Sequence, residues 1–217
     1  MIRTDHEERG GGMDLDALRS KVLPEHTALV IIDMQRDYCC EGGIFDRRGF
    51  DLRPARDLAA RLNLFLGRVR AKLPHIVHLR MMKVPGLPSP ASAEHNKRLG
   101  IDRKYDPAFG AFYEVEPKGS EMVIDKYKYS GFVSTYLDQF LKGNNIGTLV
   151  ITGLATNVCV ESTARDAFMR DYCVVLPEDL TEGSSPEAKG STLSNIAMFF
   201  GEVVRSEDLL RAWDLYQ

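Results

Sequence analysis

The chain has 217 residues, of which 44% are hydrophobic and 27% are charged, and its formal net charge is −3. This length and composition are typical of one folded domain with a sizeable core and exclude a disordered chain. The weak negative charge disfavours nucleic acid and anionic membranes as partners, because both select strongly basic chains.

Cysteine usage and the absence of targeting signals predict a cytoplasmic protein. The four cysteines form no recognisable disulfide framework, and Cys39 and Cys40 are adjacent, which disfavours a bond between them. No apolar stretch is long enough to cross a membrane, and the N-terminus lacks a signal-peptide core. We expect residues 1–12, which end in three glycines, to be a flexible tail, and residues 13–217 to form a single domain.

The first half of the chain is predicted to contain two strands around a helix. An apolar run over 28–32 ends at Asp33, which puts this carboxylate at the carboxyl end of a buried parallel strand. Open α/β sheets bind ligands at that edge. The glycine-rich loop CCEGGIFDRRGFD follows and is placed to fold over the edge. A helix is expected over 52–72, ending before Pro74, and a second strand over 76–79.

The segment from 81 to 112 has no clear periodicity and contains several prolines and glycines. It is therefore predicted to be irregular. A loop this long in a compact domain is usually functional or mobile, so we expect it to cover the pocket.

Strands and helices continue to alternate in the second half. Strands are expected over 122–124, 149–151, 173–176 and 203–204, and helices over 133–142 and 187–200, with a short helix at the end of the chain. Such alternation implies right-handed crossovers. The predicted fold is a three-layer α-β-α sandwich with a mostly parallel central sheet.

The stretch LVITGLATNVCVESTARDA, at 149–167, contains a cysteine where a buried strand becomes a helix. We expect Gly153 to break the strand, Asn157 to cap the helix, and Cys159 to lie in or next to its first turn. The positive end of a helix dipole would lower the pKa of the thiol there. The alternative is an inert, buried cysteine, which is common.

Three chemically useful side chains are thus expected at one edge of the sheet: Asp33, Lys126 and Cys159. Taken singly, the aspartate is more simply a turn acceptor and the lysine a solvated charge. Together they provide the proton acceptor and the cation that thiolate chemistry needs beside the sulfur.

Three motifs carry a family resemblance: IIDMQRDY at 31–38, DKYKYSGF at 125–132 and GLATNVCVESTARDA at 153–167. They resemble, in the same order, the motifs of the isochorismatase-like cysteine hydrolases. The resemblance implies that family's fold and a catalytic triad of Asp33, Lys126 and Cys159. It also implies an oxyanion hole formed by Ala155 and Cys159, a cis peptide bond between Leu154 and Ala155, and no cofactor.

The resemblance further implies acyl transfer through a thioester to Cys159 and the release of ammonia or carbamate. EGGIFDRRGFD and NIAMFFGEVV resemble the ureidoacrylate amidohydrolase type, with N-carbamoyl and biuret hydrolases as neighbours. A small amide or ureido compound is therefore the expected substrate. Candidate contacts for its polar group, each with a surface or packing role as the alternative, are Gln35, Arg80, Asn96, Lys97, Tyr129 and Glu161.

Two other functional classes remain open at this point. A metal-assisted nicotinamidase would need a histidine set near the second strand, but His78 in HLRMMKVPG has no second histidine nearby, so no metal is expected. A vinyl-ether-cleaving or non-catalytic relative would lack the cysteine. We also expect a homo-oligomer, either a dimer or a tetramer.

Overall fold

The computed structural model describes residues 14–82, 89–101 and 106–214, so the predicted tail over 1–12 lies outside the described residues. A seven-stranded sheet forms its centre, with strand order β3-β2-β1-β4-β5-β7 and β6 paired to β4. All these pairings are parallel. The strands are β1 (Thr27–Ile32), β2 (His75–Met81), β3 (Met122–Lys126), β4 (Thr148–Leu154), β5 (Cys173–Pro177), β6 (Thr181–Glu182) and β7 (Glu202–Val204).

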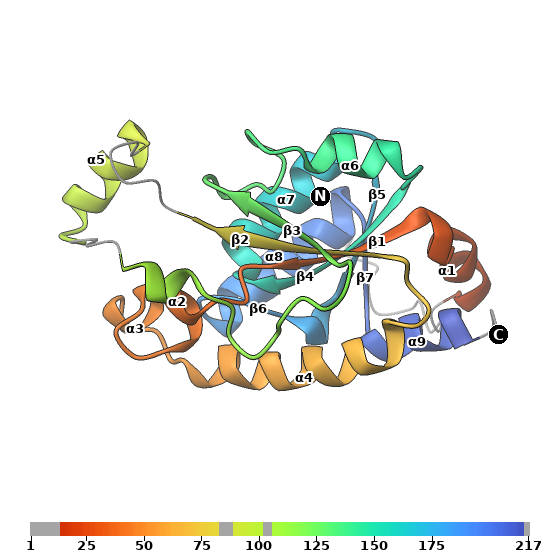
Figure 1. Ribbon diagram of the computed structural model, residues 1–217, viewed down its shortest axis with the longest axis horizontal. Helices are drawn as coiled ribbons and strands as arrows, with labels where there is room; N and C mark the ends of the chain where they lie inside the picture. Colours follow the sequence, from red (N-terminus) through yellow and green to blue (C-terminus); the bar gives the residue numbers. More distant parts are fainter. Residues whose placement is uncertain (1–13, 83–88, 102–105, 215–217) are drawn as a thin grey trace, which may run out of the picture.

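Helices cover both faces of this sheet, which confirms the predicted three-layer sandwich (Figure 1). One face packs against α1 (Leu15–Lys21), α4 (Arg53–Val69) and α9 (Ser206–Asp214). The other packs against α6 (Leu137–Gly143), α7 (Glu161–Phe168) and α8 (Pro186–Phe199). None of the helices in the described ranges is both long and apolar enough to span a bilayer.

The first strand shows why an unbroken apolar run folds at the centre of this sheet. Leu29 and Ile31 belong to the hydrophobic cluster beneath α4, and Val30 and Ile32 belong to the cluster on the opposite face. Successive side chains of a strand point to opposite faces, so a strand with helices on both sides needs apolar residues at every position. Burial of all six residues of β1 fits the prediction from its composition.

Most predicted elements are present, but several boundaries differ from the prediction. Helix α4 ends at Val69 rather than at 72, and β2 extends to Met81 rather than ending at 79. Gly153 does not end β4, because the strand continues to Leu154 with Gly153 at a φ of 100°. Helix α6 begins at Leu137 rather than at 133. The preceding residues form a turn in which the Thr135 hydroxyl donates to the Gly131 carbonyl and accepts from the Leu137 amide. Helix α1 and the two-residue strand β6 were not predicted.

The segment predicted to be irregular contains a helix, α5 (Pro90–Arg98), and a 3-10 turn over Pro107–Gly110. Every residue of α5 except Asn96 is exposed, so the helix has no apolar stripe that periodicity could reveal. Residues 83–88 and 102–105 of this segment lie outside the described residues. The loop after β1 forms two short helices, α2 (Arg36–Cys39) and α3 (Ile44–Arg47). In Figure 1, α2, α3 and α5 all lie beyond the same end of the sheet.

Candidate active site

Three buried polar side chains meet at the carboxyl edge of the sheet. Asp33 directly follows β1, Lys126 is the last residue of β3, and Cys159 lies in the turn after β4. Asp33 and Lys126 are fully buried, and Cys159 is 4% exposed. Because β2 lies between β3 and β1, the long lysine side chain has to cross it to reach Asp33.

An ion pair joins the first two of these residues. The Lys126 Nζ atom lies 2.8 Å from Asp33 Oδ2 and 3.3 Å from the backbone oxygen of Lys128. The other carboxylate oxygen, Asp33 Oδ1, has no close hydrogen-bond partner among the described residues. The thiol of Cys159 interacts with both members of the pair. The carboxylate is thus fixed by the lysine through one oxygen and has a second oxygen free to accept a proton.

The electrostatics of this cluster differ from the expectation for a helix start. Burial and the Asp33 carboxylate raise the pKa of the Cys159 thiol, and the nearby Lys126 ammonium only partly offsets them. The prediction of a lowered thiol pKa was therefore wrong. Burial also raises the pKa of Asp33. Burial acts to lower the pKa of Lys126, but the Asp33 carboxylate and Cys159 outweigh the effect of burial, so the pKa of Lys126 is raised. The resting site holds a neutral thiol beside a buried ion pair.

An unusual backbone segment carries Cys159 into this position. A Cβ atom on Gly153 would lie 2.1 Å from the Ile32 carbonyl oxygen, so only glycine fits this close approach to β1. One residue further on, the peptide bond between Leu154 and Ala155 is cis, as the family resemblance implied. Thr156 to Val160 then form a π-helical turn, and α7 begins only at Glu161.

Threonine hydroxyls hold this turn from both sides. The Thr181 hydroxyl donates to the Gly153 carbonyl at 2.8 Å and lies 2.8 Å from the Thr156 hydroxyl. The Thr163 hydroxyl donates to the Cys159 carbonyl at 2.7 Å. Ala155 and Cys159, the two expected oxyanion-hole residues, thus lie at the start and near the end of one constrained turn.

Asn157 does not cap the helix, which corrects the prediction. Its side-chain amide donates to the Ser184 hydroxyl at 3.0 Å and accepts from the Ser184 backbone N–H at 3.0 Å. The π-helical turn displaces the start of α7 and leaves Asn157 inside the turn rather than before it. Its role is to fasten the loop before α8 to the turn that carries Cys159.

Three of the candidate substrate contacts are engaged with protein groups. Gln35 is buried, and its amide bridges the backbone of Met81 and the carbonyl of Gly110. Arg80 pairs with Asp125 at 2.8 Å. The Glu161 carboxylate accepts from Arg165 and from the hydroxyl of Thr192. Gln35 and Glu161 therefore hold loops and helices together around the site.

The other candidates lie farther out. Asn96 and Lys97 are on α5, which extends away from the sheet in Figure 1. Tyr129 follows β3 and is 53% exposed. None of these residues has a side-chain hydrogen bond among those described to the Asp33, Lys126 and Cys159 cluster.

The histidine of the second strand belongs to a separate buried network. His78 Nε2 lies 2.8 Å from a Glu121 oxygen, and Glu121 also pairs with Arg70 at 2.6 Å. Burial lowers the pKa of His78, which favours its neutral form. Across the described ranges, no group of three or more histidine, cysteine or acidic side chains is arranged to hold a metal ion.

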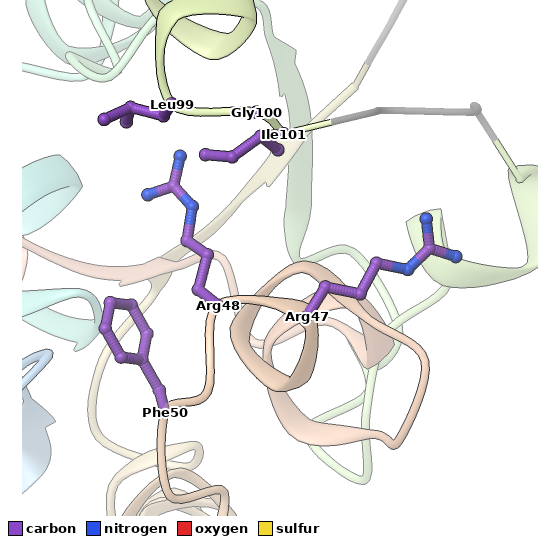
Figure 2. Close-up of a pocket in the computed structure, with 6 residues that line it drawn as sticks. All are labelled: Arg47, Arg48, Phe50, Leu99, Gly100 and Ile101. Carbon is purple, nitrogen blue, oxygen red and sulfur yellow. The ribbon is translucent and has the colours of Figure 1, made fainter.

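A cavity of about 600 Å³ opens between α3 and the end of α5 (Figure 2). It is lined by Arg47, Arg48, Phe50, Leu99, Gly100 and Ile101. Sequence reasoning missed these residues as a site, because the two halves of the lining are some fifty positions apart along the chain. The only local signal was a pair of adjacent arginines in a glycine-rich loop.

A family model described as the isochorismatase domain matches residues 27–208. A ureidoacrylate amidohydrolase from Pantoea ananatis (strain LMG 20103) is 34% identical over 198 residues, which cover 83% of this chain and 79% of the relative. The three motifs quoted above all fall within the matched range.

Solved structures share the fold. A cysteine hydrolase from Pseudomonas syringae pv. phaseolicola 1448A superposes with a TM-score of 0.77 at 24% identity, covering 91% of this chain and 96% of that one. An N-carbamoylsarcosine amidase from Thermoplasma acidophilum superposes with a TM-score of 0.66 at 26% identity, covering 83% and 96%.

Proposed function

Because this chain belongs to the isochorismatase family, we propose that it is a cysteine-dependent amidohydrolase acting on a C–N bond of a small ureido or carbamoyl amide. The observation that carries the proposal is the buried Asp33–Lys126 ion pair, with the Cys159 thiol interacting with both charges. A structural cysteine needs neither a base nor a cation beside it, and burying these charges is costly. The names of the amidohydrolase and amidase relatives support the reaction class.

In the proposed reaction, Cys159 attacks the substrate carbonyl and its proton passes to Asp33. The raised pKa of Asp33 makes the carboxylate a stronger base than an ordinary aspartate. Lys126 keeps this carboxylate ionised before the transfer and stabilises the sulfur as charge develops on it. A thiol with a raised pKa is thus deprotonated during attack rather than stored as a thiolate.

The tetrahedral intermediate then collapses to a thioester. Its oxyanion would accept hydrogen bonds from the backbone N–H groups of Ala155 and Cys159, and the constrained turn fixes both amides before substrate arrives. Asp33 returns its proton to the leaving nitrogen, which departs as an amine or as ammonia. Asp33 next removes a proton from water as the water attacks the thioester. When the C–S bond breaks, Asp33 returns this proton to the Cys159 sulfur, and the acid or carbamate product leaves with the thiol and the carboxylate restored.

A substrate panel tests this function. Ammonia release is measured from ureidoacrylate, biuret, N-carbamoylsarcosine, nicotinamide and a plain aliphatic amide, with Cys159→Ala and Cys173→Ala as paired variants. We expect turnover of a ureido compound that is lost in Cys159→Ala and kept in Cys173→Ala, because Cys173 is exposed and begins β5, at the opposite edge of the sheet from the turn. Equal activity in the two variants would contradict a cysteine nucleophile, and preference for nicotinamide would contradict the substrate class.

A further inference from the structure

The end of α7 and the outer face of α8 form an exposed apolar surface on the side of the sheet opposite α4 (Figure 1). Phe168 is 47% exposed, Met169 is 72% exposed, Met198 is 63% exposed and Phe199 is 58% exposed. The ring of Phe200 contacts the rings of both Phe168 and Phe199, so the two helices contribute to one continuous surface. With a total area of about 200 Å² each, the four exposed residues leave roughly 500 Å² uncovered, near the upper limit of apolar patches on monomers.

The outer face of α8 carries almost no charge. Thr192 and Ile196 are buried against the body of the protein, which fixes the rotation of the helix. Glu187 in the first turn is the only exposed charged residue of α8, every residue of which lies in the described ranges. In a chain with 27% charged residues, such a face indicates a surface that another molecule covers. We call Phe168, Met169 and the exposed residues of α8 the α8 surface, and those of α8 are Pro186, Glu187, Gly190, Ser191, Ser194, Ala197, Met198 and Phe199.

The α8 surface is complementary in shape to a second copy of itself. Its middle has only small residues, at Gly190, Ser191 and Ser194, and its end carries the bulky Met198. A Cβ atom on Gly190 would meet no atom within 4 Å, so the space above this position is open. Positions 190, 194 and 198 share one side of the helix. When two copies of α8 run antiparallel about a two-fold axis at Ser194, Met198 of each copy therefore lies over Gly190 of the other.

Charge and area also favour a second copy as the occupant. From 190 to 201 the sequence contains no charged residue, so the centre of the pair brings no like charges together. The antiparallel arrangement brings Glu187 of each copy towards the end of the other α8. There the Arg165 guanidinium, which also pairs with Glu161, lies 4.3 Å from the centroid of the Phe200 ring. The four large side chains alone supply more than half of the ~800 Å² per partner that a standard interface buries, and the small residues of α8 add to it.

We infer that the α8 surface is the interface of a two-fold symmetric dimer, in which the α8 helices of two copies pack antiparallel with Ser194 at the axis. This inference gives the expected homo-oligomer a location and a register. A tetramer would contain the same pair, because two such dimers can join through a different surface. No residue of the Asp33, Lys126 and Cys159 cluster belongs to the α8 surface.

Sedimentation velocity of the full chain, from about 0.1 to 100 μM, tests the interface. Wild type should reach at least twice the chain mass of 24.4 kDa. Met198→Glu and Ser194→Glu place like charges at the interface, so each variant should have half the wild-type mass and a dissociation constant larger by about a hundredfold or more. Leu64→Glu is the matched control, because Leu64 is 75% exposed on α4, beyond the other face of the sheet, and its dissociation constant should change less than about twofold.

Cross-linking tests the register without disturbing the packing. In a Cys173→Ala background, Ser194→Cys should be joined between copies by a bismaleimide that spans about 8–10 Å, the separation of packed helix axes, and Leu64→Cys should not. Peptide mapping then shows that position 194 is linked to itself. A wild-type mass of 24.4 kDa over the whole concentration range would overturn the inference and leave the surface to a different protein. An oligomer that both glutamate variants leave intact, or cross-linking at position 64 but not at 194, would overturn it as well.

Discussion

The protonation state of Cys159 is decided by its immediate neighbours. A thiol at a helix start gains from the positive end of the dipole, an effect of about 0.3–1 kcal/mol. Here the sulfur is nearly buried and lies beside a carboxylate, and both raise its pKa. Burial can shift a pKa by several units, which exceeds the dipole effect. A thiol that is buried and neutral is less susceptible to oxidation than an exposed thiolate.

The first prediction concerns Asp33 and Lys126 as a unit in turnover. Asp33→Asn keeps the side-chain shape but accepts no proton, and Lys126→Met keeps the stem without the cation. Each change should reduce kcat by orders of magnitude, and the double variant should lose little more than the worse single, because groups acting together are not additive. Steady-state kinetics on the four proteins measures this. If Asp33→Asn keeps more than about a tenth of the wild-type rate, a penalty below ~1.4 kcal/mol, the proton-transfer role is wrong.

In stability, by contrast, the double variant should be less destabilised than either single variant. Each single change leaves one buried charge uncompensated and should cost about 3–5 kcal/mol of unfolding free energy, whereas the neutral double variant should recover most of that loss. Urea unfolding provides the measurement. Equal losses that simply add would mean that the pair is solvated rather than buried, in conflict with the full burial of both side chains.

At the level of elements, the β4-to-α7 connection determines the geometry of the site. Two of its unusual features, a positive φ at Gly153 and a π-helical turn over Thr156–Val160, bring Cys159 back over the end of β1. Hydrogen bonds from Thr181 and Thr163 fix this path. The two-residue strand β6 pairs with the end of β4 and thereby positions Thr181 beside the turn.

The second prediction tests this connection. Gly153→Ala would force a Cβ against the Ile32 backbone at a φ of 100°, so we expect a loss of more than about 2 kcal/mol of stability and of most activity. Gly190→Ala is the control, because it lies in α8 with open space around the position and should be neutral or stabilising by up to about 1 kcal/mol. Similar stability changes in the two variants would show that the close approach of β4 to β1 is unimportant.

For the whole molecule, a buried network links the edge of the sheet to α4. Glu121 accepts from Arg70, which caps the carboxyl end of α4, and lies 2.8 Å from His78 of β2. Burial acts to raise the pKa of Glu121. Hydrogen bonds from Arg70, the Lys118 amide and His78 outweigh the effect of burial, so the pKa of Glu121 is lowered. Burial lowers the pKa of His78. Both groups make the folded state sensitive to acid.

The third prediction gives the sign of this dependence. Since the folded pKa of His78 lies below its ordinary value near 6.5, the unfolded chain binds a proton first as pH falls. Stability should therefore decrease from about pH 6.5 downwards, with a slope of at most ~1.4 kcal/mol per pH unit from this residue. Urea unfolding between pH 7.5 and 5.5 should show a smaller slope in His78→Gln than in wild type, and an unchanged slope in His95→Gln, which alters an exposed histidine on α5. An unchanged slope in His78→Gln would exclude His78 as the source.

The fourth prediction concerns metal ions. The proposed mechanism uses only side-chain and backbone groups, so dialysis against a chelator should leave kcat and KM of the whole enzyme unchanged. Activity that is lost on dialysis and restored by zinc or another divalent ion would contradict this mechanism and favour a nicotinamidase-like site.

The sequence by itself determined the layered fold and the identity of the three clustered side chains. An unbroken apolar run such as 28–32 predicts a strand that is buried on both faces. In a parallel sheet, the residue that follows such a strand lies at the carboxyl edge. Asp33, Lys126 and Cys159 could therefore be assigned to one edge before any contact was known. The resemblance of the three motifs to the isochorismatase-like hydrolases predicted cysteine hydrolase chemistry at that edge.

Only the tertiary structure decided the details that depend on distant neighbours. The pKa of Cys159 is set by burial and by Asp33, and the lining around Arg48 comes from α5, a helix without an apolar stripe. The π-helical turn is held by Thr181 and Ser184, which follow it by some twenty-five residues. Local periodicity predicts whether a residue faces the core, but not which side chains from distant parts of the chain it contacts. Desolvation and hydrogen bonding depend on those contacts.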